Sequence, residues 1–148
     1  MYTNLTTEER AMIMGRLPFK SDLLRELNKI AAERGIRAGA IQLMGGVSRV
    51  LLSHFDQETR AYQIQDRDAP HEIVSGLGNI SIKNDAPFVH LHLAVADREG
   101  KVFGGHALDG CRVYAVDYVI WPFAGEEPKR VYDNETGLHL WEKEQYEG

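Results

Sequence analysis

Residues 87–121 read PFVHLHLAVADREGKVFGGHALDGCRVYAVDYVIW, a stretch in which apolar runs alternate with turn-like segments. The first run predicts a strand, and alternate side chains of a strand point to the same face, so His90 and His92 project together. Residues 97–100 are typical of a hairpin turn, because they form a short polar loop that ends in glycine between two apolar runs. A third histidine, His106, follows a glycine pair in the returning run.

The register of this hairpin determines whether the three histidines meet. If Ala96 pairs with Lys101, the residue before His106 lies opposite His92. We therefore predict a bulge at the glycine pair, Gly104–Gly105, which adds one residue and brings His106 opposite His92 on the same face. Side chains that oppose each other in this way lie about 4.5–5.5 Å apart at Cβ, close enough for three imidazoles to converge on one divalent ion. The alternative is that the His-x-His pair is only part of a polar surface.

Three neutral imidazoles without a thiolate favour zinc, at about 2.0–2.1 Å from each nitrogen. Three protein ligands leave one coordination position open for an activated water, a small anion or a side chain of a neighbouring subunit. A hydrolase would also need a general acid or base near the metal, and the candidates are Glu72, Asp109 and Asp117. A carboxylate in an antiparallel sheet is more often a turn residue, an ion-pair partner or a surface charge than a catalytic group.

The other histidines and the single cysteine are expected to be structural. His54, His71 and His139 lack a partner motif and are assigned to surface or structural positions. Cys111 begins a predicted strand and is expected to be a small buried hydrophobe, since free cysteines are usually buried and inert.

The central block resembles the PPC domain, the "plants and prokaryotes conserved" domain of plant AT-hook proteins and of stand-alone bacterial proteins. The pattern that carries the resemblance is His-x-His followed by Gly-Lys-Val-x-Gly-Gly-His-x-x-x-Gly-Cys-x-Val. Further matches occur in the family's order across residues 12–123. They are RLP at 16–18, GIRAGA at 35–40, GGVS at 45–48 and EIVSGLGNI at 72–80.

This resemblance implies an antiparallel α+β fold, assembly as a homotrimer and, as in some members, zinc at His90, His92 and His106. Asp117 stands where the family commonly has glutamate, which has a longer reach. Bacterial members are often described as DNA-binding proteins. In the plant proteins a separate Arg-Gly-Arg-Pro hook grips the minor groove, and this sequence contains no such hook.

Length and composition fit one globular domain. The chain has 148 residues, of which 43% are hydrophobic and 26% charged. We expect a single domain over residues 1–148, with a core of about 10–123 and a C-terminal strap over about 124–148. No run reaches the roughly 18 apolar residues of a membrane span, and the first residues do not resemble a signal peptide. With one cysteine only, these features predict a cytoplasmic protein without a membrane partner.

The net charge of −5 disfavours DNA as a partner. A duplex-binding domain gains most of its affinity by neutralising phosphates with Lys and Arg, and no basic cluster stands out in the sequence.

The hydrophobic pattern predicts about seven strands and one main helix, hence an α+β domain with a largely antiparallel sheet. We expect the helix over residues 22–34, with Ser21 as its N-cap and Gly35 at its end. The glycine pair Gly45–Gly46 is expected to break the extended segment 36–55 into two strands. Residues 10–17 are expected to form a first strand, after a possible helical turn at residues 6–9.

Residues of the strap are expected to pack back onto the domain. They are the apolar side chains of Val131, Tyr132, Leu138, Leu140 and Trp141.

Three functions from different classes follow. The favoured one is a trimeric, zinc-binding domain that binds a small ligand or a protein partner. The second is a DNA-binding regulator, which only the resemblance suggests. The third is a zinc-dependent hydrolase or lyase, which the open coordination position suggests. The sequence therefore leaves enzyme activity open and favours a non-enzymatic protein.

Overall fold

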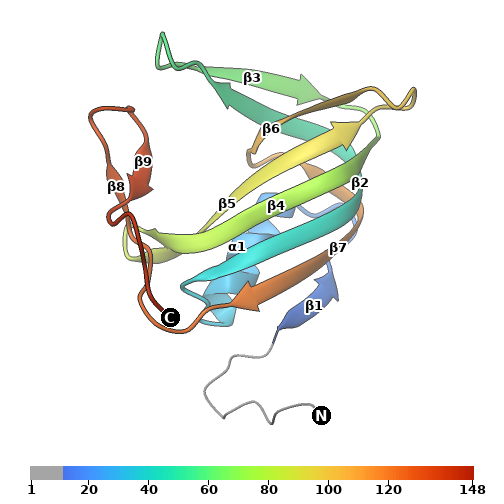
Figure 1. Cartoon of the computed structure of the whole chain (residues 1–148). Helices are drawn as coiled ribbons and strands as arrows, with labels where there is room; N and C mark the ends of the chain where they lie inside the picture. Colours follow the sequence, from blue (N-terminus) through green and yellow to red (C-terminus); the bar gives the residue numbers. More distant parts are fainter. Residues whose placement is uncertain (1–11) are drawn as a thin grey trace, which may run out of the picture.

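The computed structural model describes residues 12–148, so the helical turn expected at residues 6–9 lies outside the described part. Within that part the chain forms one α-helix and nine β-strands (Figure 1). Their bounds are β1 (Ile13–Arg16), α1 (Leu23–Glu33), β2 (Gly39–Phe55), β3 (Tyr62–Arg67), β4 (His71–Lys83), β5 (Ala86–Ala96), β6 (Val102–Ala107), β7 (Arg112–Pro122), β8 (Arg130–Tyr132) and β9 (His139–Trp141). No helix among these residues is long and apolar enough to cross a membrane.

Seven strands form one sheet in the order β1-β7-β2-β4-β5-β6, with β3 paired to β2 outside this path. All of their pairings are antiparallel. Because β2 also pairs with β6, the sheet curls until its last strand meets the C-terminal half of β2. The helix α1 covers one face of the sheet (Figure 1). The predicted α+β class, with a seven-stranded antiparallel sheet and one helix, is confirmed.

The strand β2 runs without interruption for 17 residues, so the expected break at Gly45–Gly46 is wrong. The glycine pair instead accompanies shifts in register against both neighbours, β4 and β7. Gly45 has a φ of +134°, and a Cβ there would lie 2.0 Å from the carbonyl oxygen of Ala115, so only glycine fits. The strand can therefore pair with β4 and β7 in its first half and with β3 and β6 in its second.

The helix α1 begins at Leu23, one residue later than predicted. Asp22, not Ser21, is the N-cap, and its side chain accepts a 3.1 Å hydrogen bond from the backbone N–H of Arg25. Gly35 follows the helix with a φ of +62°, as the sequence predicted. The helix packs its apolar stripe on the sheet through the buried residues Leu23, Leu27 and Ala31.

The C-terminal strap contains a hairpin, β8–β9, that stands beside the sheet and leans toward the β2–β3 hairpin (Figure 1). Arg60, in the β2–β3 loop, donates hydrogen bonds to the carbonyl oxygens of Asn134 (3.1 Å) and Glu135 (2.7 Å) in the β8–β9 turn. The expectation that apolar strap residues pack back is wrong for four of the five. Those four are exposed: Val131, Tyr132, Leu140 and Trp141. Polar contacts of Arg60 and Arg130 connect this hairpin to the rest of the chain instead.

Candidate metal centre

The β5–β6 hairpin brings His106 directly opposite His92, but without the predicted bulge. Ala96 pairs with Val102 rather than with Lys101, and the ladder from there to the histidines is regular. The connection is one residue longer than expected, because the backbone N–H of Asp97 donates to the carbonyl oxygen of Lys101 at 3.0 Å. The predicted meeting of the histidines is therefore found, whereas its predicted cause is wrong.

The glycines before His106 serve close strand packing. A Cβ on Gly104 would lie 2.5 Å from the carbonyl oxygen of Leu93, and one on Gly105 would lie 2.7 Å from that of Ser53. Both contacts are with backbone atoms, which cannot move aside without disturbing a strand. Glycine thus lets β6 lie close to both β5 and β2, where His106 pairs with Ser53.

The imidazoles of His90, His92 and His106 form one cluster on the sheet. The ring centroid of His90 lies 4.9 Å from that of His92 and 4.9 Å from that of His106. The centroids of His92 and His106 are 5.7 Å apart. One ring nitrogen from each residue lies within 4.8 Å of the others, and Nε2 of His90 is 3.2 Å from Nε2 of His92. Nitrogens around one tetrahedral zinc are roughly 3.4 Å apart, so small ring rotations would close the set around an ion.

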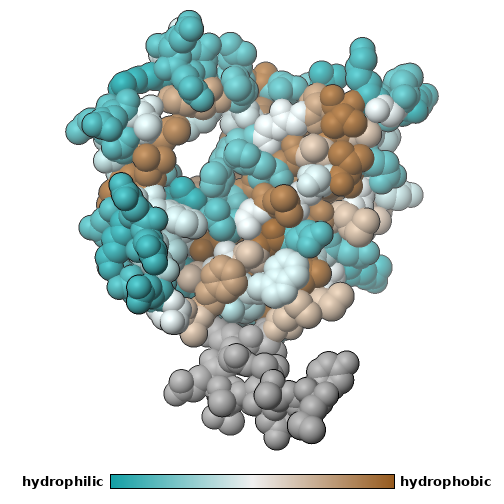
Figure 2. Space-filling view, in the orientation of Figure 1, coloured by the Kyte–Doolittle hydropathy of each residue, from teal (hydrophilic) through white to brown (hydrophobic). Residues whose placement is uncertain are grey.

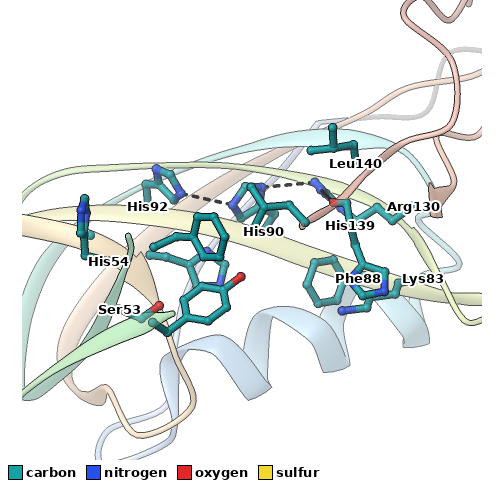
Figure 3. A pocket seen from close by; sticks show the side chains of 14 residues that line it. Ser53, His54, Lys83, Phe88, His90, His92, Arg130, His139 and Leu140 are labelled. Carbon is teal, nitrogen blue, oxygen red and sulfur yellow. Dashed lines mark hydrogen bonds between the residues drawn. The ribbon is translucent and has the colours of Figure 1, made fainter. Parts of the chain in front are cut away.

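Arg130, from β8, fixes the orientation of His90. Its Nη2 donates a 3.2 Å hydrogen bond to Nδ1 of His90 (Figure 3). Because a guanidinium can only donate, Nδ1 is the acceptor and a neutral His90 carries its proton on Nε2, toward His92. For a metal to bind Nε2, the proton of His90 would have to move to Nδ1, and the hydrogen bond from Arg130 would then be given up.

The cluster favours neutral imidazoles. Burial, and to a smaller extent the charge of Arg130, lowers the pKa of His90 from 6.5 to about 4. Burial and the neighbouring His92 also lower the pKa of His106. Neutral imidazole is the form that binds a metal, so the residues present fit the predicted ion.

Sequence reasoning missed Arg130. Besides His90, its guanidinium donates to the side chains of Ser81 (2.8 Å) and Asn79 (3.1 Å) and to the carbonyl oxygen of His139 (3.1 Å). It also lies over the ring of Phe88, with 5.5 Å between its Cζ and the ring centroid. No motif surrounds Arg130 in the sequence, and most of its partners are 40 or more residues away, so no local signal was available.

A pocket of about 500 Å³ opens over the histidine cluster (Figure 3). It is lined by the three histidines and by side chains from the β2–β3 hairpin, the β4–β5 hairpin and the β8–β9 hairpin. Those lining residues include Ser53, His54, Phe55, Tyr62, Lys83, Phe88, Arg130, Leu138, His139 and Leu140. His54 and His139, assigned from sequence to surface or structural positions, are exposed residues at this pocket, whereas His71 is buried elsewhere.

The three carboxylates proposed for the surroundings of the metal lie elsewhere. Asp109 forms an ion pair with Nε of Arg25 at 2.9 Å. Glu72 lies on β4 opposite Ala96, five residues along β4 from the pairing partner of His92, and Asp117 lies on β7. None of them is among the described residues that line the histidine pocket.

Cys111 is fully buried, as predicted, and its Sγ donates to the carbonyl oxygen of Leu51 at 3.4 Å. Burial raises the pKa of this thiol, so it has the character of a structural residue.

Several solved structures share this fold. A metal-containing protein from Archaeoglobus fulgidus is 34% identical, with a TM-score of 0.87 over 92% of this chain and 96% of that one. A plant- and prokaryote-conserved protein from Pyrococcus horikoshii is 28% identical, with a TM-score of 0.86 over 98% and 99%. A proposed DNA-binding protein from Bacteroides thetaiotaomicron is 26% identical, with a TM-score of 0.84 over 90% and 93%.

Curated relatives are much longer than this chain. The bifunctional protein GlmU from a Synechococcus strain is 34% identical over 100 residues, which are 67% of this chain but 15% of that protein. A GlmU from a second Synechococcus strain is 32% identical over 100 residues, again 67% of this chain and 15% of that protein. The family model of the Plants and Prokaryotes Conserved (PCC) domain matches residues 6–124. By this match, which covers most of its length, the chain belongs to the PCC domain family.

Proposed function

We propose that this PCC-domain protein binds one divalent metal ion, zinc, through His90, His92 and His106. The observation that carries the proposal is the direct pairing of His92 with His106 on neighbouring strands, with His90 two residues along the same face. Three imidazoles without a thiolate or carboxylate suit zinc. The similarity to a metal-containing protein from A. fulgidus supports the presence of a metal but not its identity.

The proposed ion would have three protein ligands and one position open toward the pocket. Such an open position can hold a small ligand or a side chain of a protein partner, and either would make the domain a binding module. Of the three functions that the sequence left open, hydrolase or lyase chemistry has the least support. The described lining of the pocket contains no carboxylate that could act as a general base.

Metal analysis of protein purified without chelator and without metal-affinity resin tests the proposal. We expect about one zinc ion per chain in the wild type and less than a tenth of that in His92→Ala. Glu72→Ala is the matched control and should keep its metal, because Glu72 lies outside the pocket. A wild-type protein that carries no metal and binds none on titration would contradict the proposal.

We further propose that the domain assembles as a homotrimer. Large apolar side chains are exposed on the sheet and line one shallow groove, which supports association through this surface (Figure 2). They are Met14 (71% exposed), Met44 (63%), Val74 (56%) and Leu77 (59%). Sedimentation equilibrium should give about three times the chain mass of 16.7 kDa. A mass equal to one chain at every concentration would contradict this assembly.

DNA binding is the second candidate, favoured by the relative from B. thetaiotaomicron that is described as a proposed DNA-binding protein. The net charge of −5 opposes it. Fluorescence anisotropy with a labelled duplex at low salt separates the two candidates. Affinity that falls steeply as salt is added would support DNA binding, and no change in anisotropy at low salt would exclude it.

For the cellular compartment we propose the cytoplasm, on the basis of the single free thiol of Cys111.

A further inference from the structure

The pocket over the histidines is rich in positive charge. Lys83 and Arg130 both line it, and no carboxylate of the described residues does. Neither cation forms an ion pair within residues 12–148. The ammonium of Lys83 lies 5.0 Å from the ring centroid of Phe88, beside the histidine cluster (Figure 3). A concave site that gathers positive side chains without a neighbouring negative charge attracts an anion.

Ser53 adds an unused polar group to the same site. Its side chain is 2% exposed, it pairs with His106 across β2 and β6, and it lines the pocket. Its Oγ has no hydrogen-bond partner among residues 12–148. Buried hydroxyls are normally hydrogen-bonded, so an unpaired one at a pocket wall is explained if a ligand atom pairs with it.

The upper walls of the pocket are apolar. On one side the rings of Phe55 and Tyr62 pack together, with centroids 5.0 Å apart, near the end of the β2–β3 hairpin. On the other side Leu138 and Leu140 come from the β8–β9 hairpin. Arg60 joins the tips of the two hairpins, and Figure 2 shows the opening that remains between them.

We propose that this pocket binds a small organic anion, with a carboxylate or phosphate group at the floor formed by the histidines, Lys83 and Ser53, and an aromatic or aliphatic body between the two hairpins. The proposal rests on the proposed metal site, because an oxygen of the anion would take the open coordination position. A volume of about 500 Å³ is typical of small-molecule sites and too small for a folded partner.

Isothermal titration calorimetry with four simple probes tests this proposal. Benzoate and phenyl phosphate carry the expected anionic group, and benzyl alcohol and benzylamine present the same ring with a neutral or a cationic group. We expect the anions to bind zinc-loaded protein at least about tenfold more tightly than the other two probes. Whichever of benzoate and phenyl phosphate binds more tightly identifies the headgroup that the pocket prefers.

Two variants assign this binding to the pocket. Lys83→Met should weaken anion binding by about tenfold, whereas Lys101→Met, in the β5–β6 connection and outside the lining, should leave it unchanged. Ser53→Ala should weaken binding without lowering the unfolding temperature, because its hydroxyl has no hydrogen-bond partner to lose among the described residues. A purely structural role for Ser53 would give the opposite pattern.

Benzyl alcohol or benzylamine binding as tightly as benzoate would overturn the proposal, and so would anion binding that is insensitive to Lys83→Met. Failure of the metal site is recognised separately, by zinc content. If the protein takes up no zinc but still binds anions through Lys83, the anion site stands and the metal proposal falls. If it takes up zinc but binds none of the anions, the metal proposal stands and the anion site falls.

Discussion

The β5–β6 hairpin and the β8–β9 hairpin both line the histidine pocket, but different interactions hold them in place. In β5 the alternate residues Leu91, Leu93 and Val95 are fully buried in the core, and hydrogen-bonded neighbours lie on both sides of the strand. The strands β8 and β9 have three residues each and, within the described part of the chain, pair as strands only with each other. Apolar burial therefore fixes the metal-binding hairpin. The hairpin that closes the pocket is held by arginine contacts and by a 2.7 Å backbone hydrogen bond from Ile82 of β4 to Pro128, just before β8.

The largest expected effect comes from breaking the close packing of β6. Gly105→Ala should lower the free energy of unfolding by about 2–3 kcal/mol and reduce zinc uptake, because its Cβ would press on the carbonyl oxygen of Ser53. Urea denaturation measures the first effect and metal analysis the second. Gly46→Ala is the matched control, since a Cβ there would meet nothing closer than 3.8 Å. If both variants had the same free energy of unfolding and the same zinc content, the close packing of β6 against Ser53 would be contradicted.

A smaller effect is expected from releasing the β8–β9 hairpin. Arg130→Ala removes the hydrogen bonds to Ser81, Asn79 and His90, so the free energy of unfolding should fall by about 1–3 kcal/mol. Hydrogen exchange should accelerate in β8 and β9 and stay slow in β5. In the control, Arg112→Ala, only an exposed 3.4 Å ion pair with Asp68 is lost, which costs less than about 1 kcal/mol. Unchanged exchange in β8 and β9 would mean that other contacts hold this hairpin.

A third effect, the pH dependence of stability, sharpens the comparison further. The folded-state pKa of His90 lies at about 4, below the 6.5 of the unfolded chain, so the unfolded state binds more protons between these values. In metal-free protein the contribution of His90 to the free energy of unfolding should be fully present above about pH 6.5. It should decrease as the pH falls toward about 4.

Urea midpoints across this range measure the effect, and His90→Gln should flatten the dependence. His139→Gln, an exposed residue of the other hairpin, serves as the control. A slope in His90→Gln as steep as in the wild type would assign the effect to other groups.

The same contrast explains what the sequence could predict. That His90 and His92 share one face follows from strand alternation, which is a local signal. The register that places His106 opposite His92 comes from a connection one residue longer than the sequence predicted. The glycine pair at Gly45–Gly46 was misassigned because a glycine can end a strand or shift its register, and only the close carbonyl of Ala115 distinguishes the two.

Arg130 illustrates the limit most clearly. Its partners Asn79, Ser81 and His90 are brought to it only by the complete fold, and an arginine in a polar tail is usually solvated. The shape of the pocket and its second wall were therefore beyond the reach of sequence patterns, although its floor of histidines was predicted.

A cobalt(II) titration tests the central claim most directly, because visible absorption of bound cobalt reports the coordination of the ion. We expect a four-coordinate spectrum that saturates at about one cobalt per chain. It should be lost in His106→Ala and retained in His54→Ala, because His54 lines the pocket but lies outside the cluster. Saturation that persists in His106→Ala, or a wild-type protein without any such spectrum, would contradict this claim.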